Sequence, residues 1–492
     1  LYKYVLIGGT VSDDYGLERF EIYYKNADQA KEYKRKKITL IQNQNEQEFF
    51  HELKLDSIGI KEGQKLEYYL AVWDNDGVNG SKVYKTNKQT YILPSKQAIQ
   101  SKLDQQKEKT SLDMTNSSDQ SEDLSMKIKK LQEDLKGKKQ LDWQDKKDIK
   151  KVIKEHNEFN TKIKELNKQI QKEQEQNERF HQEDEELQKK IDHLNKLMNE
   201  LLDEETKKLM EDLEKLLDKN GNIDQIQNKL EKIKDNDDEL QKELDRTIEL
   251  YKKLKFDQQL NKTIKDLNKL ASKQEKLAKE TNNKTKVKTD LTKKQNALNA
   301  EFKEVEKKLE ELDQMNKELK SPNTMDDLKE QQKEIEQEQQ ESSDELKNGS
   351  RKKASDSQKG AASKMKQMAG KMKQMQQSME MEKLEEDLAN LRQILHNLLY
   401  LSFTQEKLLN SFKKIEQSDP QFVYLSQKQI NLNESSKVVE DSLYALASRI
   451  YQIEPYITKE LSNMLKYMVQ SNNAIKARRK NYAVAKQHYA MT

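Results

Sequence analysis

No proline occurs between Pro94 and Pro322 in this chain of 492 residues, whereas seven of its twelve glycines fall in residues 1–80. Glycine and proline are the residues that most often form turns and interrupt helices. The front of the chain is therefore expected to be rich in turns, and a long central stretch can continue through unbroken helices.

Residues 126–320 carry apolar side chains at helical spacing. The steps are three or four residues, as in the run Leu240, Leu244, Ile248 and Tyr251. Charged residues fill the other faces, which is typical of helices that pack on helices, so we predict a coiled-coil or helical region. Two interruptions favour folding back into helical hairpins, namely Asn220-Gly221-Asn222 and Asn282-Asn283.

Residues 1–95 alternate apolar and polar side chains in short runs. Turn-forming clusters separate the runs, among them Asp13-Asp14-Tyr15-Gly16 and Lys61-Glu62-Gly63. Alternation with a period of two is the pattern of half-buried strands. Short strands in a segment of this length predict a small immunoglobulin-like (Ig-like) antiparallel β-sandwich.

The rest of the chain divides by its apolar content. Residues 96–125 are rich in Ser, Asp, Gln and Lys and are expected to form a polar linker or a weakly helical lead-in. Residues 321–382 are rich in Gln, Lys and Met and are expected to form a low-complexity linker. Residues 383–492 regain apolar stripes and predict a C-terminal helical bundle. Its first stripe is Leu384, Leu388, Leu391, Leu395, Leu398 and Leu399.

The balance of charges limits the class of protein. Basic residues number 91 and acidic residues 88, and the mean hydropathy is −1.15, which fits long solvated helices better than a large globule. The two charges interleave, so no basic stripe for nucleic acid is present. Cysteine is absent, which excludes disulfides and thiol catalysis. No run approaches the ~20 apolar residues of a membrane span.

Acidic turns in the front segment are candidates for a calcium site. Asp13-Asp14 and Asp74-Asn75-Asp76 gather carboxylate and amide oxygens, which are the ligands that Ca²⁺ prefers. The spacing fails the helix-loop-helix calcium pattern, because Val78 and Lys85 stand where ligands belong. Calcium at Asp13, Asp14, Asp74 and Asp76 is one hypothesis, and Asx turns at strand ends are the simpler alternative.

A methionine stripe offers a candidate partner surface. Met365, Met368, Met372 and Met375 step by three or four residues and so share one helix face. Methionine suits adaptable surfaces, and the neighbouring lysines would make this helix cationic. The alternative is a helix that packs its methionines on a neighbour.

No catalytic constellation is evident. No two of the six histidines lie three or four residues apart, so no paired-histidine metal face forms on a helix. Neither the GxxxxGK[ST] phosphate loop nor the GxSxG nucleophile elbow occurs. We therefore expect no catalytic residues, no resident cofactor and no enzymatic activity.

Several blocks together resemble one bacterial family. They are WDNDGVNGSK at Trp73–Lys82, LDRTIEL at Leu244–Leu250, LRQILHNLL at Leu391–Leu399 and DSLYAL at Asp441–Leu446. They are similar, in the same order, to the family catalogued as domain of unknown function 4175. Its members have transmembrane helices near the start, then an envelope-side β region and a long helical region. The resemblance implies an internal piece of a protein anchored upstream of Leu1, on the periplasmic side of the inner membrane.

These observations lead to one principal expectation. It is a non-enzymatic structural or interaction protein, a scaffold of the bacterial cell envelope that binds protein partners and self-associates through its helices. The alternative is a cytosolic coiled-coil partner of a motor or chromosome-organising ATPase. An enzyme is a third interpretation, and it would require Asp14 and Asp76 to converge in one pocket.

Overall fold

The structure is a computed structural model that describes residues 4–41, 44–76, 80–180, 185–201, 204–219, 221–283, 285–323 and 328–491. Helices make up 73% of the chain, which confirms a mostly α protein with a small antiparallel β region at its front. Two compact units emerge, one formed by Leu1–Lys109 with Lys172–Gln182 and the other by Thr110–Gln171 with Glu183–Thr492.

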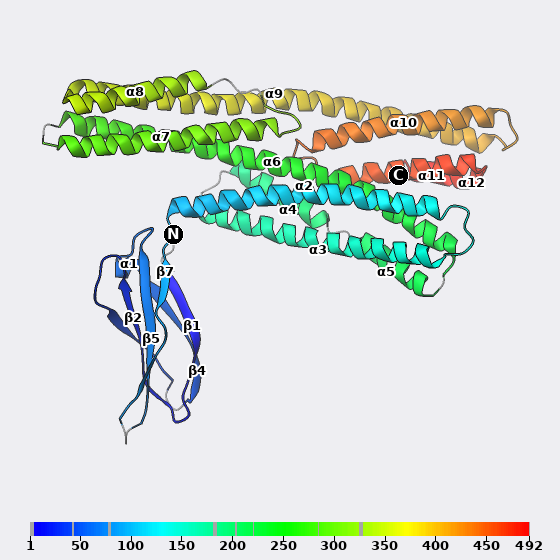
Figure 1. Ribbon diagram of the computed structural model, residues 1–492. Helices are drawn as coiled ribbons and strands as arrows, with labels where there is room; N and C mark the ends of the chain where they lie inside the picture. The colour runs from blue at the N-terminus through cyan, green and yellow to red at the C-terminus, as the bar shows by residue number, and fades with distance from the viewer. Residues whose placement is uncertain are drawn as a thin grey trace. The chain divides into compact units, whose positions relative to one another are not determined.

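The first unit contains the strands (Figure 1). They are β1 (Tyr4–Ser12), β2 (Leu17–Asn26), β3 (Lys34–Ile38), β4 (Glu46–Lys54), β5 (Lys65–Asp74), β6 (Val83–Lys85) and β7 (Gln89–Ile92), with the short helix α1 (Leu55–Ile58) after β4. β1 and β4 pair as one antiparallel sheet, and the second sheet has the order β3-β2-β5-β6, with β7 also on β5.

Both sheets contribute to one core. Phe20 of β2 lies opposite Ile38 of β3 and Val72 of β5. Its ring meets that of Phe49 in β4 edge to face, with the centroids 4.7 Å apart. The alternation read from the sequence thus places every second side chain of β2 inward, as period-two strands require.

The helices follow in chain order. They are α2 (Lys96–Asp134), α3 (Trp143–Phe180), α4 (Glu185–Glu200), α5 (Glu204–Asp218), α6 (Ile223–Asn282), α7 (Lys288–Lys317), α8 (Lys329–Asn348), α9 (Arg351–Lys414), α10 (Gln421–Ala447), α11 (Pro455–Lys476) and α12 (Lys480–Tyr489).

Two long helices organise the second unit. α6 has 60 residues and α9 has 64, so each is about 90–96 Å long at ~1.5 Å per residue. α7, α8 and the first half of α9 pack on the second half of α6, and α10 to α12 pack on the second half of α9 (Figure 1). The first half of α6 instead shares cores with α2, α3, α4 and α5.

The helix ends are specified by local chemistry. The side chain of Asn222 accepts a hydrogen bond of 2.8 Å from the amide of Asp224 and so caps the start of α6. Gly349 ends α8 with φ of 81°, a left-handed conformation that favours glycine. The breaks predicted at Asn220-Gly221-Asn222 and Asn282-Asn283 are confirmed, because α5 ends before the first and α6 ends at the second.

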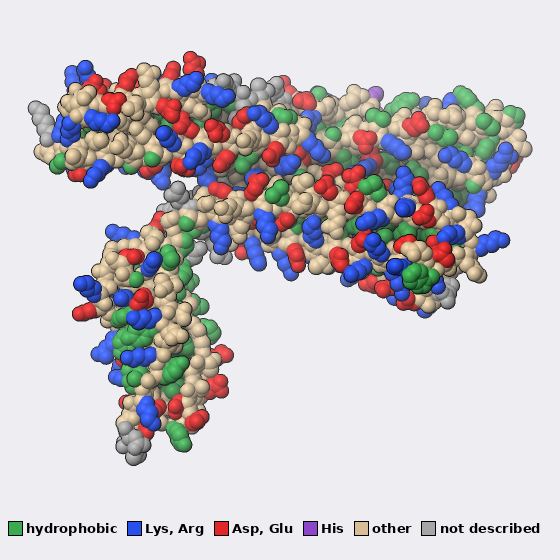
Figure 2. Space-filling view, viewed as in Figure 1, with side chains coloured by type: hydrophobic (Ala, Val, Ile, Leu, Met, Phe, Trp, Pro, Cys, Tyr) green, Lys and Arg blue, Asp and Glu red, His purple; other side chains and the backbone are tan. Residues whose placement is uncertain are grey.

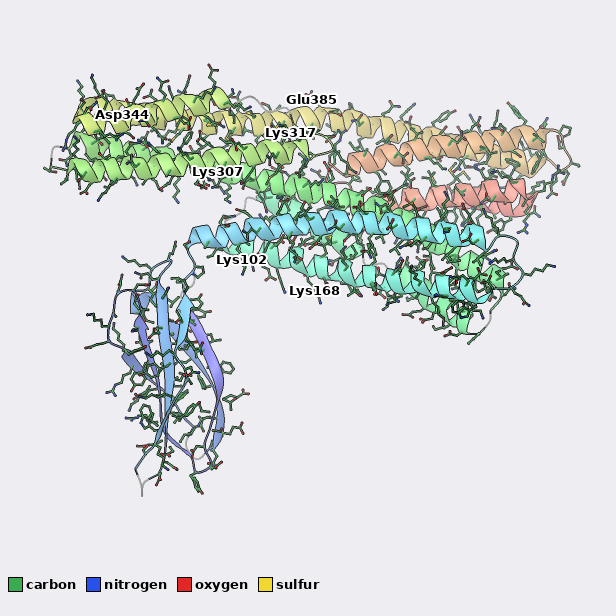
Figure 3. All side chains as sticks on the ribbon, in the orientation of Figure 1. Lys102, Lys168, Lys307, Lys317, Asp344 and Glu385 are labelled. Carbon is green, nitrogen blue, oxygen red and sulfur yellow. The ribbon has the colours of Figure 1, made fainter. Side chains whose placement is uncertain are left out.

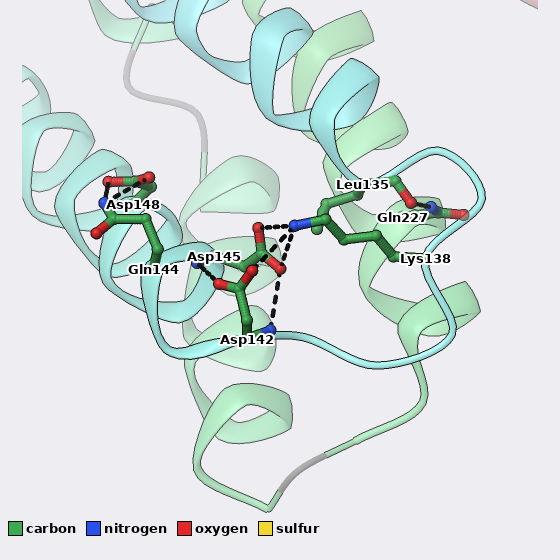
Figure 4. A network of polar contacts seen from close by, with 7 residues as sticks. All are labelled: Leu135, Lys138, Asp142, Gln144, Asp145, Asp148 and Gln227. Atoms are coloured by element: carbon green, nitrogen blue, oxygen red, sulfur yellow. Dashed lines mark hydrogen bonds and ion pairs between the residues drawn. The ribbon is translucent and has the colours of Figure 1, made fainter.

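The turn between α2 and α3 is held by a reciprocal cap (Figure 4). The amide of Asp145 donates to Asp142 Oδ1 at 2.8 Å, and the amide of Asp142 donates to Asp145 Oδ2 at 3.0 Å. Lys138 Nζ lies 2.7 Å from Asp145 Oδ1, and Gln227 of α6 donates to the carbonyl of Leu135 at 2.7 Å. A capping box of this kind fixes both the start of α3 and the direction of the chain entering it.

Neither segment expected to be a linker is one: residues 96–125 follow the helical alternative, and the low-complexity linker predicted for residues 321–382 is wrong. Residues 96–125 belong to α2, and residues 321–382 contain α8 and the first half of α9. Many core positions in these segments are taken by small or polar side chains, which are buried at helical spacing and interrupt the pattern of large apolar residues. They include Thr110, Ser117 and Ser121 in α2, Gln339 and Ser342 in α8, and Ala354, Ala361 and Ala369 in α9.

Candidate functional site

The predicted calcium residues form turns at one end of the strands. Asp13 Oδ1 accepts hydrogen bonds from the amides of Tyr15, at 2.9 Å, and Gly16, at 3.1 Å. Asp74 Oδ1 accepts from the amide of Lys82 at 2.7 Å. Asp76 pairs with Lys82 over 3.7 Å. Three residues of the predicted block, numbers 77–79, lie outside the described residues.

The structure brings these two turns together through amides. The backbone amide of Asn75 donates to the carbonyl of Gly16 at 3.2 Å, and its side chain donates to the carbonyl of Tyr15 at 2.9 Å. Within the described ranges no group of three or more His, Asp or Glu side chains is arranged to hold a metal ion. The contacts of Asp13 are those of the Asx-turn interpretation, whereas Asp74 accepts from the amide of Lys82 eight residues further along the chain.

The predicted methionine surface lies inside the second unit. Met365, Met368 and Met372 are buried in the core that α6 to α9 share, and Met375 packs against it half-buried. The interpretation in which they pack on neighbouring helices fits this structure, and the interpretation in which they form an exposed partner surface does not.

Two histidines, His156 and His193, occupy buried polar sites that the sequence pattern did not indicate. His156 of α3 lies 2.9 Å from Asp237 of α6, and Asn160 lies 3.2 Å from its other ring nitrogen. His156 lies among Ile149, Ile153, Phe159 and Ile163 at helical spacing. A polar residue within an apolar stripe is therefore the sequence feature that could have predicted this buried site. His181 lies outside the described residues.

Arg246 forms the centre of a buried polar cluster on α6. Its side chain is 1% exposed and is the largest that the described part of the chain buries so fully. Its nitrogens contact the carbonyls of Ala447, at 3.2 Å, and Ile453, the carboxylate of Glu243 at 3.3 Å, the hydroxyl of Thr458 at 3.4 Å and the ring of His193 at 3.4 Å. These groups come from α4, α6, the end of α10, the turn after α10 and α11, so one guanidinium joins five segments.

Burial controls protonation in this cluster. Desolvation, followed by the charge of Arg246, lowers the pKa of His193 to about 4, so its ring is neutral at pH 7 and accepts from the guanidinium. Burial also raises the pKa of Glu200 and of the Tyr444 phenol. Arg246 lies in the LDRTIEL block and Tyr444 in the DSLYAL block, so two blocks quoted for the resemblance meet here.

A groove of about 470 Å³ lies between α4, α6 and α9. The turn after α10, which contacts Arg246, also lines this groove through residues 449–452. The apolar side chains that line it include Phe256, Leu260, Leu384, Leu388, Leu391 and Ile450. We call this cavity the α9 groove. An apolar cleft with a few placed polar groups is the form that binding sites commonly take.

Ion pairs border the α9 groove. Lys190 and Asp257 lie 2.9 Å apart, as do Arg449 and Asp387. Lys253 donates to the carbonyl of Arg449 at 3.0 Å. Burial lowers the pKa of the Lys253 ammonium and raises the pKa of the Asp387 carboxyl. Perturbed lysines also occur in active sites, but this ammonium is already held by a protein carbonyl, which fits a structural role.

An exposed apolar row runs along α9, and three of its members, Leu384, Leu388 and Leu391, also line the α9 groove. Met381, Leu384, Leu388, Leu391 and Leu395 are 69, 58, 45, 42 and 57% exposed. We call these five residues the α9 seam. Figure 2 shows hydrophobic side chains gathered over the half of the second unit that holds α10 and the end of α9. The bundle core of this half of α9 is formed by Ile394, Leu401 and Leu408, and of the leucine stripe only Leu398 packs against it.

Lys307, Lys317, Asp344 and Glu385 are exposed charged residues on α7, α8 and α9 (Figure 3). Among the described residues, no helix is both long and apolar enough to cross a bilayer.

No family model, no curated protein and no solved structure matches this chain. The resemblance to domain of unknown function 4175 therefore stays a prediction.

Proposed function

We propose that this chain is a non-enzymatic scaffold of the bacterial cell envelope that acts by binding other proteins through α9. The observation that carries the proposal is the α9 seam beside the α9 groove. Contiguous apolar side chains with a charged border mark interaction sites on soluble surfaces, because exposing them to water is unfavourable unless a partner covers them.

The architecture supports this role through rigidity. α9 is held on one side by α6 and α8 and on another by α10, so its open face is presented on a fixed support. We further propose that the β region is an Ig-like sandwich and that the helices pack as coiled-coil hairpins. Both are common in proteins that recognise partners or span distance.

The interaction role is tested by photo-cross-linking in the cells that make the protein. A photoreactive amino acid replaces Leu391 in the seam or, as a matched control, Lys307 on an exposed face of α7. We expect a covalent adduct to a protein from position 391 and none from position 307. The absence of an adduct from both positions would contradict the interaction role.

The location rests on the family resemblance and is tested separately. An epitope is placed beside the β region of the intact protein, and protease is added before and after the outer barrier is opened. Cleavage only after opening agrees with the periplasmic side of the inner membrane. Protection until the inner membrane breaks would favour the alternative, a cytosolic coiled-coil partner of a motor or chromosome-organising ATPase.

A further inference from the structure

The spacing of the α9 seam is that of a coiled-coil contact. Its five residues step by three, four, three and four, which is the a and d pattern of a heptad. Met381, Leu388 and Leu395 occupy a positions, and Leu384 and Leu391 occupy d positions. Such a row fits a partner helix that carries the same row.

The seam is a second apolar face of the same helix. Ile394, Leu401 and Leu408 recur every seven residues and are buried in the core with α10 to α12. The seam is therefore not needed to hold α9 in its bundle. A helix with one apolar face inside and another in solvent has hydrophobic surface left to bury, at about 25 cal/mol per Å².

We propose that the α9 seam pairs with the seam of a second copy of this chain, with the two helices antiparallel. This inference rests on the proposed function and names its partner. The match in spacing is self-complementary, since Leu388 meets Leu391 of the second copy, and Leu384 meets Leu395. A two-fold axis between residues 388 and 391 then relates the two copies.

The charges beside the seam select this orientation. Glu385 and Arg392 occupy successive e positions and are exposed. Neither makes an ion pair with another of the described residues. In the antiparallel arrangement, e positions face each other, so Glu385 of each copy lies beside Arg392 of the other. A parallel pairing in register would instead bring Glu380 beside Glu385 of the second copy, where like charges are unfavourable. It would also bring Arg392 beside Asp387, but that carboxylate is mostly buried and already paired with Arg449 over 2.9 Å.

Disulfide trapping tests the orientation without background, because the chain contains no cysteine. Leu384→Cys and Leu395→Cys are made as separate single variants of the full chain, with Lys307→Cys as a control away from the seam. Under mild oxidation, a mixture of the two seam variants should form a mixed dimer, whereas each alone and the control stay unlinked. Self-linking of Leu384→Cys would indicate a parallel pair and overturn the proposal.

Charge reversal provides an independent measurement. Glu385→Arg and Arg392→Glu should each raise the dimer dissociation constant by about fivefold, as exposed ion pairs are lost and replaced by repulsion. The double variant should return to the wild-type value, because the pair is restored with its signs exchanged. Equal loss in the double variant would contradict the pairing. Leu388→Glu should weaken the dimer by about tenfold or more, since a charge would enter the seam.

The two proposals fail in different ways. A chain that stays monomeric in light scattering, yet gives an adduct to a different protein from position 391 in cells, would overturn the self-pairing and leave the interaction role in place. A monomer with no adduct would overturn both. A monomer whose seam cysteines resist labelling would show that the chain's own segments cover the seam, which also overturns the pairing.

Discussion

Gln295 of α7 lies fully buried in the bundle of α6 to α9, and side chains from three other helices contact it. Gln274 donates to its Oε1 at 2.8 Å, Gln358 at 3.0 Å and Ser342 at 3.1 Å. A comparable layer joins Gln405, Gln429 and Gln487 in the other bundle. Sliding any helix by one turn would leave these amides without partners, which is how buried polar layers specify helix register.

Replacing Arg246 should be the most damaging single polar change. Arg246→Met keeps much of the volume but removes the donor of the carbonyls of Ala447 and Ile453. It also takes the guanidinium away from the Glu243 carboxylate, which keeps only the Thr458 hydroxyl as a donor among the described residues. Breaking a buried charge pair from one side destabilises by about 3–5 kcal/mol. Urea unfolding measures the change, with the exposed Lys168→Ala as control. A loss no greater than that of the control would contradict the role given to Arg246.

His193 should make stability depend on pH. Its pKa is lowered from 6.5 to about 4 by burial and then by Arg246, so between these values the unfolded chain binds a proton that the folded chain does not. The free energy of unfolding should therefore fall as pH decreases from 6.5 to 4, by about 2–3 kcal/mol. His193→Gln keeps an acceptor for Arg246 and should remove this part of the slope. An unchanged slope in the variant would refute the assignment.

At the scale of the element, Glu306 of α7 should make the free energy of unfolding fall as pH rises, which is opposite to the dependence expected from His193. Burial, followed by the charge of Glu336 and a hydrogen bond to it, raises the pKa of Glu306 in α7 to about 7. The folded state holds this proton more tightly than the unfolded chain, so the contact of α7 with α8 weakens as pH rises from 4.5 through 7.

Glu306→Gln should consequently stabilise the chain at pH 8 and have little effect at pH 5. The gain at pH 8 is expected to be about 1–2 kcal/mol after allowing for partial exposure. Unfolding by urea at both pH values provides the measurement, and the exposed Glu341→Gln of α8 is the matched control. A gain of equal size at both pH values would exclude titration of Glu306 as its cause.

The turn between α2 and α3 allows a test of whether its capping residues determine where α3 begins. Asp145→Ala removes the carboxylate that accepts from the Asp142 amide, and should destabilise the start of α3 by about 1 kcal/mol. Asp148→Ala, three residues along the same helix, removes only contacts with Gln144 and should change stability little. Amide exchange of residues 143–148 reports on the turn directly, and equal exchange in both variants would argue against the cap.

The sequence predicted elements wherever leucine and isoleucine mark the buried face. It indicated the β region of the front and the breaks at Asn222 and Asn283. It gave no strong signal for α2 and α8, because Ser, Thr and Gln fill several of their core positions and interrupt the apolar pattern.

The candidate site was predicted less well than the fold. The Arg246 cluster joins residues about two hundred positions apart, and no local sequence pattern predicts contacts over that separation. The leucines of the seam were recognised as a stripe, but periodicity gives a helix an apolar face without saying whether a neighbour covers it. The methionines, which looked more adaptable, are the ones that the bundle buries.

At the scale of the whole molecule, α6 and α9 connect cores that would otherwise be separate. α6 contributes to three of the hydrophobic clusters and α9 to two. A partner that binds the second half of α9 therefore contacts a helix whose first half is buried among α6, α7 and α8. Such continuity gives a scaffold a stiff surface, because bending α9 would disturb both of its cores.

Thiol labelling along α9 tests directly whether one face of this helix is open while another is closed. Single cysteines replace Leu384, Leu388, Leu391 and Leu395 in the seam, and Ser355→Cys serves as the buried position on the same helix. Labelling is followed at concentrations low enough to keep the chain monomeric. The seam cysteines should react at least about 100-fold faster than position 355, whose thiol is reached only when the bundle opens. Slow labelling at all five positions would mean that the seam is covered, and the account of α9 as an interaction surface would be wrong.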